Sequence, residues 1–149
     1  MATVKADRNK TIDTSLSEGQ IYLNRCIAVT QKQVDLDRVL DKTVIGNMMD
    51  VCSLLPPKSI DLIIADPPYN LTKSFNGTIF TKKKEADYEE YTRQWLSAIK
   101  PLLKDDASIY VCCDWETSLI IGKVLSEFFY VRNRITWQRE KGRGAKATF

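Results

Sequence analysis

The chain of 149 residues contains no histidine, which excludes catalytic triads with an imidazole base and metal centres with histidine ligands. Its four cysteines lack the paired C-x-x-C spacing of a zinc site, so we expect no metal centre. We expect them to be buried, reduced thiols, which favours a cytoplasmic location. Any catalysis must use carboxylate, tyrosine, lysine, cysteine or backbone groups.

Long apolar runs and a strong net charge are also missing. No apolar run reaches the ~20 residues of a membrane span, and the N-terminus does not resemble a signal peptide. We therefore expect no membrane partner. The 22 basic and 19 acidic residues give a net charge of only +3, so the distribution of basic residues matters more than their total. An apolar content of 44% indicates a globular chain.

The most informative stretch runs from Ile60 to Asn70. Ile60 to Ala65 is a mostly apolar run rich in β-branched residues, which predicts a strand buried on both faces of a parallel sheet. Pro67 and Pro68 lack backbone N–H groups and predict a stiff turn directly after it. This turn would lie at the carboxyl end of the strand, where open α/β sheets bind ligands.

The residues of this turn suit a planar amino group. Asp66 offers carboxylate acceptors, the carbonyls around Pro67 have no partner in a sheet, and Tyr69 offers a flat ring beside them. An exocyclic NH2 donates two hydrogen bonds in the plane of its base, so two converging acceptors can hold it while an aromatic ring stacks on the base. Such bonds draw the nitrogen lone pair out of conjugation and make the nitrogen a usable nucleophile.

The sequence Asp66-Pro67-Pro68-Tyr69 after an apolar strand resembles the catalytic motif of DNA amino-methyltransferases. These enzymes transfer a methyl group from S-adenosyl-L-methionine to adenine N6 or cytosine N4. Aspartate in the first position resembles the adenine-N6 enzymes, because the cytosine-N4 enzymes usually carry serine. The resemblance implies a restriction-modification type of DNA methylation, with these four residues catalytic and Asp66 also near the cofactor. A structural strand end with a Pro-Pro turn is the alternative.

Alternating strand and helix patterns predict an α/β fold with a doubly wound sheet, Rossmann-like as in the S-adenosylmethionine-dependent methyltransferases that the chain resembles. Residues 1–20 read as a flexible arm and residues 21–149 as a partial catalytic domain. The predicted helices are 34–41, 48–55, 87–100 and 116–129, with Asp87 as a cap of the third. The predicted strands are 43–47, 60–65, 107–113 and 130–137, and the first two should form a βαβ unit around the helix between them.

A cofactor contact is expected at Asn47. In the methyltransferases that this chain resembles, the strand before the catalytic one ends in Gly-Asp, and the acid contacts the cofactor. This chain has Gly46-Asn47 instead, and asparagine can accept a hydrogen bond from an adenine amino group but lacks the charge. An asparagine that only stabilises a turn is the alternative.

Two segments carry candidate DNA-binding residues. The loop from Leu71 to Ala86 is polar and long, which is typical of a lid, and its lysine run 82–84 could contact phosphate or be ordinary surface. A basic, glycine-bearing loop follows Ile135-Thr136-Trp137, and in the resembling enzymes this region lies near the target base. The candidate DNA-binding residues are Tyr69, Asn70, Lys73, Trp137, Arg139, Lys141, Arg143 and Lys146.

No stretch resembles the glycine-rich F-x-G-x-G cofactor loop, which in the β group of these enzymes follows the target-recognition region. The resemblance therefore covers the N-terminal catalytic part only, and we expect a sheet that is incomplete at the C-terminus. A second chain, a homodimer or a missing C-terminal half would complete it, and activity alone would be poor. Alternatives are a catalytically inactive DNA-binding or interaction module, and an N-methyltransferase acting on RNA or on a protein glutamine.

Overall fold

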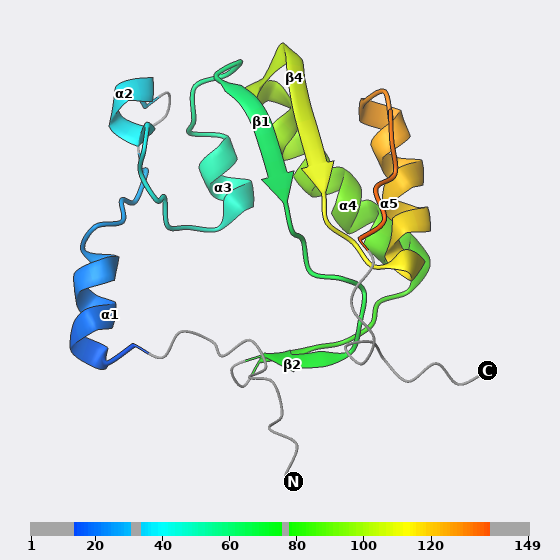
Figure 1. Ribbon diagram of the computed structural model, residues 1–149, viewed down its shortest axis with the longest axis horizontal. Helices are drawn as coiled ribbons and strands as arrows, with labels where there is room; N and C mark the ends of the chain where they lie inside the picture. Colours follow the sequence, from blue (N-terminus) through cyan, green and yellow to red (C-terminus); the bar gives the residue numbers. More distant parts are fainter. Residues whose placement is uncertain (1–13, 31–33, 76–77, 138–149) are drawn as a thin grey trace, which may run out of the picture.

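The computed structural model describes residues 14–30, 34–75 and 78–137, in which a small sheet packs with one face against helices (Figure 1). The helices are α1 (Leu16–Leu23), α2 (Leu36–Val39), α3 (Met48–Cys52), α4 (Glu85–Ile99) and α5 (Trp115–Phe128), with a 3-10 turn η1 (Lys100–Leu102) after α4. The strands are β1 (Ile60–Ala65), β2 (Lys73–Phe75), β3 (Thr78–Phe80) and β4 (Leu103–Val111). The chain is therefore a mixed α/β structure, as predicted.

The central sheet consists of β1 and β4, which pair in parallel. Ile63, Ile64 and Ala65 lie opposite Ile109, Tyr110 and Val111. The predicted strand 60–65 is confirmed at both ends, whereas β4 begins and ends earlier than the predicted 107–113. Because the two strands run in the same direction, the residues that follow them meet at one edge of the sheet.

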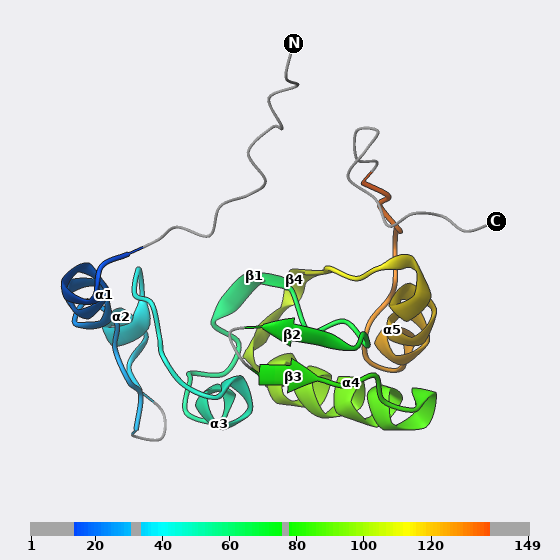
Figure 2. The same ribbon diagram turned by 90° about the horizontal axis from the view of Figure 1, so that it is seen from below.

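One face of this sheet packs against the core of the molecule, where α4 runs along it (Figure 2). Trp95, Leu96 and Ile99 of α4 are buried, as the predicted apolar stripe of this helix requires. Val124 of α5 joins them, and Ile63 packs on the cluster from the sheet. The helix is longer at its start than predicted, and its N-cap is Lys84 rather than Asp87.

The opposite face of the sheet is not buried, and here the sequence prediction is wrong. Leu62 and Ile64 of β1 are 51% and 70% exposed, and Tyr110 beside Ile64 is 52% exposed. A parallel strand is buried on both faces only where elements cover both sides of its sheet. Within the described part of the chain, the core cluster covers one side only.

Two further strand predictions fail for a common physical reason. Val44 makes only an isolated parallel bridge with Ile27, so residues 43–47 do not form a βαβ unit with β1. Residues 130–137 form no regular element, and Ile135 and Trp137 are 75% and 90% exposed. An apolar or alternating pattern becomes a strand only where a neighbouring edge supplies its backbone hydrogen bonds.

The N-terminal helix α1 was not expected, and it crosses the boundary predicted at residue 20. Ser15 and Glu18 form a capping box, in which the Ser15 hydroxyl accepts from the Glu18 amide and the Glu18 carboxylate accepts from the Ser15 amide. The S-x-x-E spacing is the sequence signal that could have predicted this start. Of the helices that the structure describes, none has the length and apolar character to cross a membrane.

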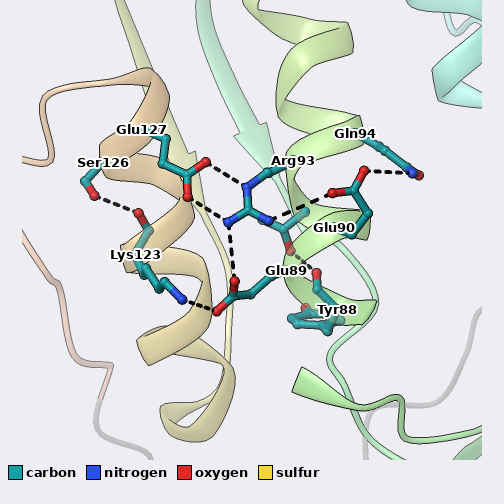
Figure 3. A network of polar contacts seen from close by, with 9 residues as sticks. Tyr88, Glu89, Glu90, Arg93, Gln94, Lys123, Ser126 and Glu127 are labelled. Atoms are coloured by element: carbon teal, nitrogen blue, oxygen red, sulfur yellow. Dashed lines mark hydrogen bonds and ion pairs between the residues drawn. The ribbon is translucent and has the colours of Figure 1, made fainter. Parts of the chain in front are cut away.

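An ionic cluster joins α4 to α5 (Figure 3). The Arg93 guanidinium makes two hydrogen bonds of 2.8 Å to the carboxylate of Glu127 and one of 3.3 Å to Glu89. Lys123 of α5 donates to the other oxygen of Glu89. A hydrogen bond from Lys123 lowers the pKa of Glu89, and hydrogen bonds from Arg93 lower the pKa of Glu127.

The cluster should make the stability of the protein depend on acid pH. A carboxyl whose pKa is lower when folded contributes stability above its ordinary value of 4.5, and that contribution disappears as pH falls through the folded pKa. We expect Arg93→Gln to lose less stability than the wild type between neutral pH and about pH 3, measured by urea unfolding. Lys104→Gln, which breaks the exposed pair with Asp61, is the control. Parallel losses in wild type and Arg93→Gln would contradict this role.

Candidate active site

The predicted motif lies at the carboxyl edge of the sheet. The turn that begins at Asp66 follows β1 directly, and Cys112 to Asp114 follow β4 at the same edge. The Cys112 amide donates a 2.8 Å hydrogen bond to the Ala65 carbonyl, which extends the parallel ladder by one step. The chain after β4 therefore lies beside the start of the Asp66 turn.

The hydrogen bonds of this turn leave a specific set of acceptors free. The Pro68 carbonyl accepts a 3.0 Å hydrogen bond from the Tyr88 hydroxyl of α4. The Tyr69 carbonyl accepts a hydrogen bond from the Leu71 amide. Among the described residues, the carbonyls of Asp66 and Pro67 have no backbone partner. The Asp66 carboxylate accepts a hydrogen bond from the Tyr69 hydroxyl. A carboxylate has several lone pairs, so both the exposed Asp66 carboxylate and the Pro67 carbonyl can still accept hydrogen bonds from a donor.

Tyr69 is half-buried beside these acceptors. Burial, followed by a hydrogen bond to the Asp66 carboxylate, raises the pKa of Tyr69 to about 12, and the Cys112 and Cys113 thiols add to the effect. The phenol therefore stays neutral across the physiological pH range. A neutral, flat ring therefore lies beside the Asp66 carboxylate, and its stacking on a target base stays a prediction.

Asn70 holds the end of the turn to the start of α4. Its side chain is buried, its Nδ2 donates to the Lys83 carbonyl at 3.0 Å, and its Oδ1 accepts from the Lys83 amide at 2.7 Å. These two hydrogen bonds resemble those between paired strands, and they hold residues 70 and 83 next to each other. The predicted DNA contact of Asn70 stays a prediction, because its amide already has an internal role.

The segment predicted as a lid contains an antiparallel hairpin of β2 and β3, and its last two residues begin α4. Lys73, a candidate DNA-binding residue, is the first residue of β2. In the lysine run, Lys82 forms a 3.0 Å ion pair with Glu116, and the Lys83 ammonium lies 5.2 Å from the centre of the Tyr91 ring. Two of the three lysines therefore have partners within the chain, which favours surface packing for this part of the run.

Asn47 is the N-cap of α3. Its Oδ1 accepts a 3.1 Å hydrogen bond from the Met49 amide, so it stabilises the helix start as the alternative interpretation expects. The preceding Gly46 leaves room for the helix, since a Cβ there would lie 2.7 Å from Cγ2 of Val51. α3 begins at the end of the sheet where β1 ends (Figure 1). A cofactor contact through the second lone pair of the amide oxygen stays a prediction.

The remaining candidate DNA-binding residues follow α5 in the sequence. Trp137 is 90% exposed and has no regular structure around it. Arg139, Lys141, Arg143 and Lys146 lie outside the described residues. Within residues 14–30, 34–75 and 78–137, no group of three His, Cys, Asp or Glu side chains could hold a metal ion. The cysteines are free thiols, but only Cys52 is buried and Cys112 is exposed, so the expectation that all four are buried is wrong.

The functional residue that sequence reasoning missed is Tyr88. The sequence placed it in the apolar stripe of α4, and it is indeed buried, but its hydroxyl reaches the Pro68 carbonyl. Its pKa is raised to about 12, mainly by burial and then by Tyr91 and Asp114 nearby, so it remains a hydrogen-bond donor. A tyrosine in a core position, where phenylalanine would fill the space, is the signal that could have indicated a polar partner.

The sequence of the chain is similar to those of known DNA methyltransferases. Residues 60–148, more than half of the chain, match a family model described as DNA methylase. The chain is 29% identical to the Type II methyltransferase M2.MboI of Moraxella bovis over 63% of its length, and 31% identical to the DNA adenine methyltransferase YhdJ of Escherichia coli over 64%. It is 32% identical to the Type II methyltransferase M.HpaI of Haemophilus parainfluenzae over 69%. These matches span 39%, 33% and 33% of the relatives' own lengths.

Proposed function

The chain belongs to the DNA methylase family, and from this premise we propose that it supplies the base-binding, catalytic part of a DNA adenine-N6 methyltransferase. One observation carries the proposal. The turn at the carboxyl edge of a parallel sheet leaves the Pro67 carbonyl and further lone pairs of the Asp66 carboxylate able to accept hydrogen bonds, beside the neutral ring of Tyr69. In this proposal β1 and β4 are two neighbouring strands of a doubly wound, Rossmann-like sheet.

The target adenine must leave the duplex to reach this turn, as in other enzymes that modify a base. Its N6 amino group donates one hydrogen bond to the Asp66 carboxylate and one to the Pro67 carbonyl, while Tyr69 stacks on the ring. The nitrogen lone pair would attack the methyl carbon that S-adenosyl-L-methionine supplies, with the thioether as leaving group, and the Asp66 carboxylate is placed to accept the surplus N6 proton. No covalent enzyme intermediate is needed, so Cys112 and Cys113 need not act as nucleophiles.

S-adenosyl-L-methionine supplies the electrophilic methyl group on a sulfonium. Asn47 fits its adenine amino group in one respect, because one lone pair of Oδ1 caps α3 and the other is free to accept. Asn47 and Asp66 are the two residues that we assign to cofactor contact. We propose that the remaining contacts come from a second chain, from a homodimeric partner or from a C-terminal half, and that DNA is the other partner.

A labelling experiment tests this function. The purified chain is incubated with unmethylated DNA and methyl-labelled S-adenosylmethionine, and the digested nucleosides are identified by mass. Label in N6-methyladenine is expected, whereas label in N4-methylcytosine would contradict the assignment to adenine. Competition with RNA of the same sequence tests the RNA alternative. Lack of label, with one of the longer relatives active in parallel, would mean that the chain needs a further part for catalysis.

A second candidate function is a catalytically inactive DNA-binding module. It is favoured by Asn47, the predicted cofactor contact, because its side chain already caps α3. This function predicts DNA binding that weakens steeply with salt and does not respond to S-adenosylmethionine. Titration of DNA at several salt concentrations, with and without the cofactor, separates the two functions.

Tyr69→Ala should weaken capture of the base more than binding of the cofactor. Loss of base stacking lowers affinity by about tenfold or more. The fluorescence of 2-aminopurine placed at the target position reports base capture, and calorimetry reports cofactor affinity. Tyr110→Ala removes a half-exposed tyrosine from the outer face of the sheet and serves as the control. Equal loss of base and cofactor affinity in Tyr69→Ala would contradict the stacking role.

A further inference from the structure

The catalytic turn needs support from outside the sheet. Pro67 and Pro68 have no backbone N–H, so neither residue can donate to a neighbouring strand. The Cys112 amide makes the last ladder bond to β1, at Ala65. Beyond that point the turn is held by side chains.

Helix α4 supplies the support at two points. The Tyr88 hydroxyl donates to the Pro68 carbonyl at 3.0 Å, and the reciprocal pair between Asn70 and Lys83 fixes the residue after Tyr69. Both anchors belong to the first turns of α4 or to the residues just before it. The helix itself is fixed in the core by Leu96, which is fully buried. The turn is therefore attached to a helix with five buried side chains.

We propose that Tyr88 is a positioning residue for adenine capture, which holds the Pro68 carbonyl away from the base so that the Pro67 carbonyl and the Asp66 carboxylate converge on the amino group. This inference rests on the proposed function. Each carbonyl of the Pro-Pro pair could in principle accept from the base, and the stiff backbone couples their directions. When the Tyr88 hydroxyl donates to the Pro68 carbonyl, that carbonyl is occupied, and the stiff backbone then sets the direction of the Pro67 carbonyl.

Tyr88 suits this task for two reasons. Its side chain is only 3% exposed, so water does not compete for the Pro68 carbonyl from the phenol side. Burial raises the pKa of Tyr88 to about 12, so the hydroxyl keeps its proton throughout the pH range in which an enzyme works. A phenylalanine would fill the same space and lose only the donor.

The test compares Tyr88→Phe with Tyr91→Phe. Tyr91 lies on the same helix, with its ring centre 5.9 Å from that of Tyr88, and its hydroxyl has no hydrogen-bond partner among the described residues. The peptide between Pro68 and Tyr69 is the one Pro-Tyr bond in the sequence, so carbonyl-13C proline with 15N tyrosine gives one NMR signal. We expect the Pro68 carbonyl signal to move upfield in Tyr88→Phe and to stay in place in Tyr91→Phe. An unchanged signal in Tyr88→Phe overturns the anchor.

Methyl transfer gives the second measurement. We expect Tyr88→Phe to lower kcat by roughly tenfold to a hundredfold, as small misplacements in active sites do, with KM for DNA nearly unchanged. Tyr91→Phe should keep both constants. Wild-type kinetics in Tyr88→Phe would overturn the positioning role. Label in N4-methylcytosine, together with the expected carbonyl shift in Tyr88→Phe, contradicts the proposed function and supports the anchor.

Discussion

Asp66→Ala is expected to abolish methyl transfer to adenine and to leave the fold intact. The substitution removes the charged acceptor that holds the amino group and draws its lone pair out of conjugation. Loss of one preorganised electrostatic partner at a reacting centre typically costs about a hundredfold to a thousandfold in rate. Asp66 is exposed, and the substitution removes its hydrogen bond with Tyr69, so the free energy of unfolding should fall by no more than about 1 kcal/mol.

Asp61→Ala is the matched control for this experiment. Asp61 lies at the other end of β1, is exposed, and forms an ion pair with Lys104 at 2.6 Å. The control should transfer methyl groups at the wild-type rate and unfold at nearly the same urea concentration. Near-normal turnover in Asp66→Ala, measured as labelled N6-methyladenine, would remove the basis of the proposed mechanism.

The chemistry of the candidate site was predictable because its residues are adjacent in sequence. Asp66 to Tyr69 form one turn after one strand, and the pattern of a β-branched run followed by two prolines predicts both. The anchors of that turn were not predictable. Tyr88 reaches Pro68 from a helix that begins after a hairpin, and Asn70 pairs with Lys83 across the same hairpin. Such contacts depend on how elements pack, which a local pattern does not contain.

In the fold, too, elements that depend on their own sequence were predicted correctly, whereas strands that depend on distant partners were not. Helices α4 and α5 and strand β1 were predicted from their own periodicity, and all three are confirmed. The strands predicted at 43–47 and 130–137 depended on partners elsewhere in the chain. Residue 44 pairs only with residue 27, and the second segment forms no strand. A sequence pattern states that a segment could join a sheet, but the neighbouring edge decides whether it does.

The second large effect is the difference in stability between a substitution in the buried core and one on the exposed outer face of the sheet. Leu96→Ala should lower the free energy of unfolding by about 3 kcal/mol, because Leu96 is fully buried in the core cluster and its removal leaves a cavity. Leu62→Ala removes the same atoms from the outer face of β1, where the side chain is 51% exposed, and should cost no more than about 0.5 kcal/mol. Urea unfolding of both variants at low protein concentration measures the difference.

The loss of unfolding free energy in Leu62→Ala shows whether the outer face of the sheet is covered in solution. A small effect at every protein concentration means that the outer face, with Ile64 and Tyr110, stays in contact with water. An effect that grows with protein concentration means that a second copy covers this face, because association adds stability by mass action. A large effect at every concentration, equal to that of Leu96→Ala, would contradict the one-sided packing of the sheet. The prediction that both faces of β1 are buried would then hold for the protein in solution.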